Sequence, residues 1–444
     1  MSSPDNQTIN APTAQLSSLI PFAVFLLLFL GTGLALTYQG KAFAFYQLPA
    51  SIAIIPAILL AIWMGKEPLQ EKIGQFIDGA GHNNIITMCV IYLLAGAFAT
   101  VAKATGSVDA SVQLGLSVFP EYLILPGLFI VAAFLSTAMG TSMGTIAAIA
   151  PIALGFTETA DLDAAIVAGC LISGAIFGDN LSIISDTTIA STRSQGAHMK
   201  DKFRVNFKFA LPAAVTCIVV YAVLGGSVVL PEAQEYAISG IIPYVVILIL
   251  ALSGVNVFAV LLIGIALAAG IGMATTDYEL FAWINDIKKG FANMQDLFIL
   301  ALFIGGLSEL VKRQGGLAAL TQAVKKIATK LSPNNEKRAA GIGIAGLALS
   351  CNFFTANNTV SIIVVGETAK ELAEDGNVTP AQSASLLDIF ACINQGLLPY
   401  GAQALLLGTT LKLSPLEVVT AAFYPIVLFF FATFAFWRLT AKAK

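Results

Sequence analysis

The sequence predicts an all-α polytopic membrane protein with about ten transmembrane helices and two re-entrant hairpins, arranged as an inverted-topology repeat. The first observation behind this is composition. Hydrophobic residues make up 57% of the 444 residues and charged residues 11%, against roughly 25% charged in a soluble domain. Mean hydropathy is +0.83. The other two observations are two apolar stretches with polar centres and a recurring order of segments.

Apolar runs and basic loops together predict the topology. Basic residues concentrate in residues 191–208 and 312–338 and in the C-terminal tail. If these segments are cytoplasmic, both termini and the 66–84 loop are cytoplasmic too, which follows the positive-inside rule. This topology places five basic residues on the non-cytoplasmic side: Lys41, Lys103, Lys288, Lys289 and Lys412. We therefore expect an integral protein of a bacterial cytoplasmic membrane. The predicted spans lie near residues 17–36, 48–65, 85–102, 163–190, 207–230, 240–253, 256–273, 293–311, 383–410 and 416–438.

Two apolar stretches do not fit simple spans. Residues 123–157 are interrupted by small and polar residues at 136–145, and residues 339–365 are interrupted at 350–359. In the predicted topology each stretch enters and leaves the membrane on one side, as a re-entrant hairpin does. Irregular backbone at membrane depth is tolerated only where it lines a cavity or is buried in protein. The hairpin tips are therefore candidate ligand-binding segments.

The two halves of the chain repeat one order of segments. Residues 93–106 align with residues 302–315, and Gly96, Lys103 and Gly106 match Gly305, Lys312 and Gly315. In both halves a span, an amphipathic stretch, a hairpin, a polar-interrupted span and a further span follow one another. The first span of the first copy runs out of the cell, and the first span of the second copy runs into it. Many secondary transporters are built from such inverted-topology repeats. The predicted units are a scaffold over 1–84, a first repeat over 85–230 with hairpin 123–157 and broken helix 163–190, linking spans over 231–292, and a second repeat over 293–438 with hairpin 339–365 and broken helix 383–410.

The segment 177–188 carries the most polar chemistry. It holds two carboxylates, one amide and four hydroxyls between apolar flanks. An ionised carboxylate inside a bilayer costs roughly 3 kcal/mol, so such a residue is a functional-site candidate by default. Asp179 and Asp186 are close to two helical turns apart and can share a face. Each also has a structural alternative, since Asp179 can cap a helix break and Asp186 can cap a helix or meet Arg193.

These residue types suit a small hard cation. Carboxylate, amide and hydroxyl oxygens are the ligands such cations prefer, and sodium and a proton compete for one carboxylate. We expect sodium ligands at Asp179, Asn180, Ser182 and Asn358. The wider set of expected ion- or substrate-binding residues adds Thr141, Ser142, Thr145, Ser185, Asp186, Thr187, Asn357, Thr359, Asn394 and Gln395. Sodium and protons are the expected coupling ions, and no other cofactor is expected.

The motif of residues 178–188, Gly-Asp-Asn-Leu-Ser followed by Ile-Ser-Asp-Thr-Thr, resembles the signature of the NhaC-type sodium/proton antiporters, within the ion transporter superfamily. The resemblance covers residues 85–430. It implies a scaffold domain, a mobile transport domain and a homodimer. In related carboxylate carriers both hairpin tips bear Ser-Asn-Thr-like triplets. Here the second tip, residues 357–359, is close to that triplet, and the first, residues 141–145, lacks the Asn. Some similar members carry amino acids.

Two functions therefore remain open. Paired aspartates favour a sodium/proton exchanger, whereas amides in the second half favour a sodium- or proton-coupled carrier for an amino acid or small organic acid. Those amides are Asn357, Asn358, Asn394, Gln395 and Gln403. No basic residue is expected deep in the core, which argues against a dicarboxylate. Asp388 is expected to serve either a relay or a packing contact. The sequence has no zinc-protease motif, nucleotide-binding loop or catalytic dyad, and its net charge of −3 indicates no nucleic-acid partner.

Overall fold

The computed structural model describes residues 14–41, 43–118, 120–160, 162–225 and 235–441, and these described residues contain helices and no strand. The N-terminal helices are short. A π-helical segment, Leu27–Gly31, joins α1 to α2, and α6 is the amphipathic helix of the predicted 66–84 loop. The bounds are α1 Ile20–Leu26, α2 Thr32–Tyr38, α3 Ala44–Gln47, α4 Ala50–Ala53, α5 Ile55–Met64 and α6 Leu69–Ala80.

The first half then contains a long helix, an amphipathic helix, a helical hairpin, a broken helix and another long helix. The bounds are α7 Asn83–Ala104, α8 Ser107–Val118, α9 Ile124–Met139, α10 Ser142–Thr159, α11 Ala164–Leu181, α12 Asp186–Gln195 and α13 Met199–Gly225. The linking helices are α14 Ile242–Leu252, α15 Val257–Thr275 and α16 Leu280–Asn293.

The second half follows the same order. The bounds are α17 Gln295–Arg313, α18 Gly316–Leu331, α19 Glu336–Thr355, α20 Asn358–Asp375, α21 Pro380–Leu397, α22 Ala402–Leu411, α23 Pro415–Thr420 and α24 Phe423–Ala441. The predicted span 416–438 is thus divided, because α23 ends before α24 begins. The equivalent order supports the inverted-repeat prediction, and the division into scaffold and transport domains also remains a prediction.

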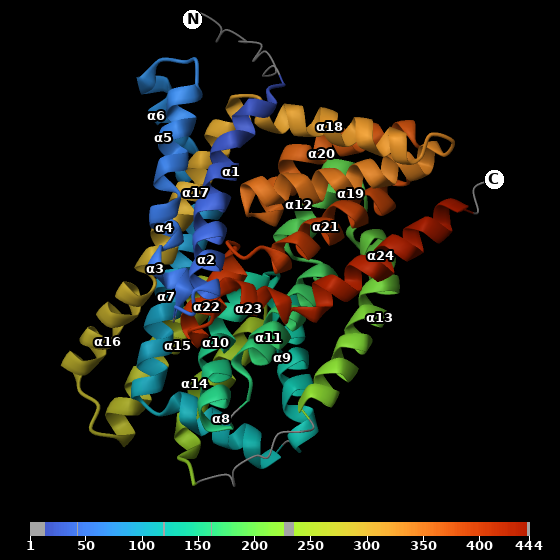
Figure 1. Ribbon diagram of the computed structural model, residues 1–444. Helices are drawn as coiled ribbons and strands as arrows, with labels where there is room; N and C mark the ends of the chain where they lie inside the picture. The colour runs from blue at the N-terminus through green and yellow to red at the C-terminus, as the bar shows by residue number, and fades with distance from the viewer. Residues whose placement is uncertain (1–13, 42, 119, 161, 226–234, 442–444) are drawn as a thin grey trace, which may run out of the picture.

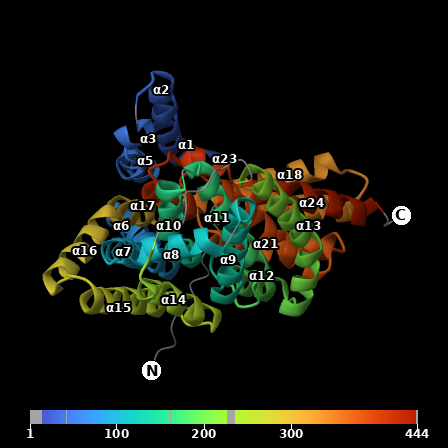
Figure 2. The ribbon, with the colours of Figure 1, turned by 90° about the horizontal axis from the view of Figure 1, so that it is seen from below.

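The helices of the two halves pack across each other around the hairpins. Helix α10 of the first hairpin contacts α22, and α20 of the second hairpin contacts α12. The blue N-terminal helices lie beside α17, and α18, α19 and α20 lie together at the other side of the molecule (Figure 1). Seen from below, α14 and α15 run along one edge, and α2 and α3 project from the opposite edge (Figure 2).

Several helices have the length and apolarity needed to cross a membrane. Judged by length and composition alone, five do so among the described residues, and a sixth arises if α16 and α17, bent by 42°, form one span. Side chains such as Leu27 and Trp63 are largely exposed on the outer surface, as expected of a protein surrounded by lipid. The five helices are Leu16–Tyr38, Asn83–Ala104, Ala164–Gln195, Met199–Gly225 and Val257–Thr275.

Close packing of α11 on α9 positions the first broken helix. A side-chain carbon on Gly174 would collide with the Phe129 carbonyl, and one on Gly178 would collide with the Ala133 carbonyl. The two glycines are one helical turn apart, so they form a smooth face on α11. Gly178 therefore allows this close approach of two helices.

One segment differs from the sequence prediction with consequences for chemistry. Residues 191–208 were expected as a cytoplasmic loop, but α12 extends to Gln195 and α13 begins at Met199. The first turns of α13 turn Lys202 and Asn206 inward, and both side chains are buried. The expectation that no basic residue lies in the core is therefore wrong.

Candidate functional site

Both hairpin tips have the same backbone geometry. The first tip turns at Gly140, in the left-handed conformation with φ of 67°, and Thr141 then caps α10 by accepting a hydrogen bond from the Gly144 N–H. The second turns at Ala356, also left-handed, and Asn357 caps α20 by accepting from the Val360 N–H. Left-handed backbone is uncommon outside glycine, so the second tip keeps this turn at a conformational cost.

Each hairpin is tied to its own broken helix by a side-chain bond. The Ser136 hydroxyl donates to the Ala175 carbonyl over 2.5 Å, and the Asn352 amide donates to the Ala391 carbonyl over 2.8 Å. Ala175 and Ala391 stand the same distance before the ends of α11 and α21. The two bonds therefore hold the tips beside the two helix breaks.

The tips and the breaks enclose a small polar cavity of about 80 Å³, here called the site cavity. Its lining comes from both hairpins, both broken helices and α7. Ten residues predicted from the sequence line it: Thr141, Ser142, Asp179, Ser185, Asp186, Thr187, Asn357, Asn358, Thr359 and Gln395.

Asp179 is the buried charge of the site cavity. It is 4% exposed. The Ser185 hydroxyl donates to its Oδ1 over 2.6 Å, and the Ser142 hydroxyl donates to its Oδ2 over 3.0 Å. Ser142 comes from the first hairpin and Ser185 from the N-terminus of α12, where partial positive charge favours a carboxylate. Both hydroxyls can turn their oxygens toward a cation instead.

The second half meets this carboxylate through amides. The Gln403 amide donates to the Ser142 hydroxyl over 3.1 Å, and the Gln395 amide donates to Gln403 Oε1 over 2.7 Å. The Gln395 Oε1 atom is buried and accepts no hydrogen bond from the described residues. A buried acceptor without a donor is costly, so this oxygen is available to a ligand.

Four predicted site residues point away from the site cavity. Helical neighbours are rotated by about 100°, so residues adjacent to Asp179 in sequence face elsewhere. The Asn180 amide donates to the Tyr424 hydroxyl, and the Ser182 hydroxyl donates to the Thr137 carbonyl. The expected sodium set of Asp179, Asn180, Ser182 and Asn358 therefore does not gather around one cavity. The Thr145 hydroxyl donates to the Thr141 carbonyl and the Asn394 amide to the Leu349 carbonyl.

One wall of the site cavity was not predicted. Helix α7 contributes Asn84, Thr87, Met88 and Ile91. Their spacing of three, one and three residues places them on one face of the helix. Two of the four are apolar, so the sequence of this face resembles that of any transmembrane helix. The two polar residues on that face, near the start of the span, were the available signal.

The side chain of Lys202 is a second feature missed from sequence. It is 1% exposed and lies 2.7 Å from the Asp388 carboxylate, which is 0% exposed. Asp388 also accepts a hydrogen bond from the Asn206 amide over 2.9 Å. Asp388 is thus held in a buried ion pair, and the two roles expected for it, relay or packing contact, stay predictions.

A larger opening leads to the site cavity. This vestibule has a volume of about 800 Å³ and includes His82, Arg193 and Ser194 in its lining. It shares Asn84, Asp186 and Thr359 with the site cavity. Asp186 is exposed whereas Asp179 is buried. Asp186 thus stands at the neck between the vestibule and the site cavity.

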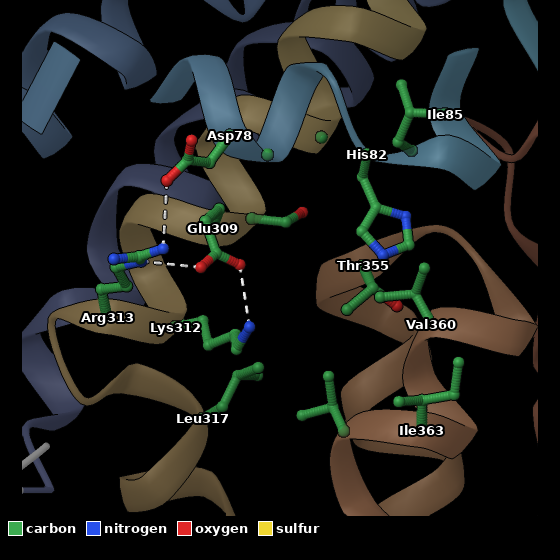
Figure 3. A pocket seen from close by; sticks show the side chains of 14 residues that line it. Asp78, His82, Ile85, Glu309, Lys312, Arg313, Leu317, Thr355, Val360 and Ile363 are labelled. Carbon is green, nitrogen blue, oxygen red and sulfur yellow. Dashed lines mark hydrogen bonds and ion pairs between the residues drawn. The ribbon is translucent and has the colours of Figure 1, made fainter. Parts of the chain in front are cut away.

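A separate side pocket of about 330 Å³ lies between α6, α17 and the second hairpin (Figure 3). Its charges neutralise one another. Glu309 contacts Lys312 at 2.9 Å and Arg313 at 2.8 Å, and Arg313 contacts Asp78 at 3.2 Å. His82 and Thr355 face this cluster in Figure 3. The side pocket is larger than the site cavity, but it lacks a buried unpaired charge.

Comparisons with known proteins agree with the geometry. The profile of the family described as "Na+/H+ antiporter family" matches residues 5–226 and 233–439. The chain is 24% identical to the Na(+)/H(+) antiporter NhaC of Bacillus subtilis over 85% of this chain and 89% of that protein. It is 24% identical to the Malate-2H(+)/Na(+)-lactate antiporter of Bacillus subtilis over 89% of this chain and 90% of that protein.

A more distant relative is the Arginine/ornithine antiporter ArcD of Halobacterium salinarum, 21% identical over 83% of each chain. Among solved structures, the YdaH transporter of Alcanivorax borkumensis aligns with 12% identity and a TM-score of 0.44, over 96% of this chain and 99% of that one. The profile match covers nearly the whole sequence. The chain is therefore an integral membrane protein that belongs to the Na+/H+ antiporter family.

Proposed function

We propose that this protein is a sodium/proton antiporter that works by alternating access, with Asp179 as the group that holds either ion. The observation that carries the proposal is a buried carboxylate, 4% exposed, at the meeting point of two hairpin tips and two helix breaks. Family membership supports the same reaction class. Sodium and a proton cannot both bind one carboxylate at full strength, so their competition couples the two fluxes.

The ligand atoms suit sodium. Asp179 supplies charge, and Ser142 and Ser185 supply hydroxyl oxygens within hydrogen-bond distance of it. Gln395 adds the buried acceptor oxygen that has no donor in the described part of the chain. Hard monovalent and divalent cations prefer such oxygens. This set replaces the set of sodium ligands expected from sequence, retaining Asp179.

The size of the site cavity also favours an ion. Its volume of about 80 Å³ accommodates an ion with one or two waters, since each water takes roughly 30 Å³ in the liquid. Pockets for organic ligands are typically about 300–1,000 Å³. In the conformation of this structure, the site cavity is smaller than a typical pocket for an organic ligand.

The second candidate function is sodium- or proton-coupled carriage of an amino acid or small organic acid. Asn357, Asn358, Gln395 and Gln403 line one side of the site cavity, and amides recognise an organic solute better than a bare ion. The relatives named as malate/lactate and arginine/ornithine antiporters support this class. The Lys202 ammonium is paired with Asp388, so it is not free to bind a dicarboxylate.

Access to the site cavity supports an inward-facing arrangement. The vestibule is lined by His82, Arg193 and Ser194, and their segments are the ones predicted to be cytoplasmic. We propose that this face is cytoplasmic, that both termini lie on it in a bacterial cytoplasmic membrane, and that the protein works as a homodimer. Movement of the hairpins and broken helices against a scaffold of residues 1–84 would open the other side.

Transport in liposomes distinguishes the two functions. Purified protein is reconstituted with a pH-sensitive dye inside, and sodium is added outside. An exchanger makes the lumen alkaline without any organic solute, and the Asp179→Asn variant gives no signal. A carrier instead accumulates a labelled amino acid or organic acid on a sodium gradient. Solute uptake together with no proton movement would overturn the exchanger assignment.

A further inference from the structure

A buried ammonium group lies behind the first helix break, outside the site cavity. Lys202 on α13 is 1% exposed. Its Nζ lies 2.7 Å from Asp388 Oδ2 and donates to the Thr188 hydroxyl over 2.6 Å and to the Asn180 carbonyl over 3.4 Å. Three oxygens thus lie within 3.4 Å of the ammonium nitrogen. Asn180 and Thr188 flank the break on its two sides, and Asp388 comes from the other broken helix.

This cluster has more acceptor oxygens than donors. Asp388 Oδ1 and Asn180 Oδ1 are buried, and neither accepts a hydrogen bond from the described residues. The other carboxylate oxygen, Asp388 Oδ2, contacts the Lys202 ammonium and accepts a hydrogen bond from the Asn206 amide. An ion pair that serves only packing is normally satisfied on all its lone pairs, because orphan oxygens are costly in a low-dielectric interior. The surplus of oxygens is what a cation site requires.

We propose that Lys202 occupies a second cation site as a tethered ammonium, so that the intact chain binds sodium only at Asp179, and removal of Lys202 lets sodium bind at Asp388. Ammonium and sodium are both monovalent cations that bind oxygen ligands. The ligands of the second site are the Asp388 carboxylate, the Asn180 carbonyl and the Thr188 hydroxyl. The Lys202 side chain thereby fixes how many sodium ions one chain binds.

This second site is separate from the one assigned to transport. Neither Lys202 nor Asp388 lines the site cavity, the vestibule or the side pocket. Only the count of one sodium in the intact chain rests on the proposed function. The Asp179→Asn variant tests that count, whereas variants of Lys202 test the second site.

The experiment measures sodium binding and thermal stability of the purified full-length protein in sodium chloride and in choline chloride at equal ionic strength. Lys202→Ala leaves Asp388 without a counter-charge and leaves room for an ion. The rise in its melting temperature from choline to saturating sodium should exceed that of the parent by about 3 °C, and it should bind one more radioactive sodium ion per chain than the parent. Lys202→Ser, which adds a hydroxyl oxygen, is the second variant.

The matched control removes both charges. Lys202→Ala combined with Asp388→Asn should show no larger sodium-dependent rise in melting temperature than the parent, because both keep the Asp179 site, and Asp179→Asn combined with Lys202→Ala should regain sodium binding that Asp179→Asn alone lacks. The proposal is overturned if Lys202→Ala and Lys202→Ser show no larger sodium-dependent rise in melting temperature than the parent, gain no sodium, or fold in neither salt. Full sodium binding by Asp179→Asn alone would instead contradict the proposed function.

Discussion

The two halves of the site share a backbone but not a chemistry. The third residue from the end of α11 is Asp179, and the third from the end of α21 is Gln395. The first helical residue after each tip is Ser142 in one half and Asn358 in the other. The cap of the second broken segment is Ser185 in the first half and Gly401 in the second, where no side chain caps the helix.

This difference separates the contribution of backbone geometry from the contribution of the side chains. Two tips and two breaks create one cavity where helix ends meet, and both halves are needed for that geometry. In the proposed function, the charge that exchanges sodium and a proton comes from Asp179, in the first half. The other half contributes amides, which bind but do not titrate in the physiological range. An exchanger with one titrating carboxylate needs such an asymmetry.

The largest expected effect separates the two equivalent residues. Asp179→Asn keeps the shape of the side chain and removes its charge, so sodium-driven proton movement should fall by more than about 100-fold. Losing an interaction with a charged group of roughly 3 kcal/mol corresponds to that factor. Gln395→Leu should reduce exchange by about tenfold or less, because only a neutral oxygen is lost. Proton fluxes in liposomes measure both. Equal losses of sodium-driven proton movement in the two variants would show that the two halves do not differ in function.

The second prediction concerns pH. A proton competes with sodium for the ionised Asp179, so raising the pH should lower the apparent half-saturation constant for sodium. The change is up to about tenfold per pH unit below the pKa of the site carboxylate and vanishes above it. Initial rates between about pH 4 and 9 measure it, a range that begins near the ordinary pKa of an aspartic acid. Because glutamine does not titrate, Gln395→Leu should leave unchanged the slope of the sodium half-saturation constant against pH.

A flat profile in the intact protein would reject competition at a shared carboxylate and favour sodium-coupled uptake of an organic solute. Asp186 stands at the neck of the site cavity and is the second candidate for a proton-carrying group. If Asp179 alone exchanges ions, Asp186→Asn should leave the pH dependence of the half-saturation constant for sodium as steep as in the parent. A flattened slope in that variant would assign a share of the proton to Asp186.

The third prediction compares two serines of the same helix break. Ser185 donates to Asp179, whereas Ser182 donates to the Thr137 carbonyl. Ser185→Ala should raise the half-saturation constant for sodium about five- to tenfold, as expected for roughly 1–1.5 kcal/mol. Ser182→Ala should change it less than about twofold. If Ser182→Ala has the larger effect on sodium affinity, the ligand assignment is wrong.

The polar tips and Asp179 were predictable because each interrupts an apolar run. A charge or several hydroxyls within an apolar segment need polar surroundings. Ser142 and Asn358 have them because both line the site cavity. Side-chain direction was not predictable from adjacency. Asn180 follows Asp179 in sequence but faces Tyr424, because the helix rotates by about 100° per residue.

Long-range pairing was the other limit. Lys202 follows a polar segment and has the pattern of a solvated loop residue. Its burial depends on Asp388, far along the chain, and a single sequence does not show which carboxylate meets which ammonium. The α7 wall was missed for a similar reason, since Met88 and Ile91 resemble lipid-facing side chains until the tips are placed against them.

The smallest expected effects test whether the two hairpins are anchored equivalently. Ser136→Ala removes the donor to the Ala175 carbonyl, and Asn352→Ala removes the donor to the Ala391 carbonyl. Each change leaves a buried carbonyl without its partner, which costs about 1–3 kcal/mol. Both variants should therefore melt a few degrees below the parent when purified in detergent, with sodium affinity changed less than about threefold. Ser117→Ala is the control, because its exposed hydroxyl bonds only to Leu114 of its own helix. A fall in melting temperature for one hairpin variant alone would show that the halves are anchored differently, and the equivalence would then be limited to backbone shape.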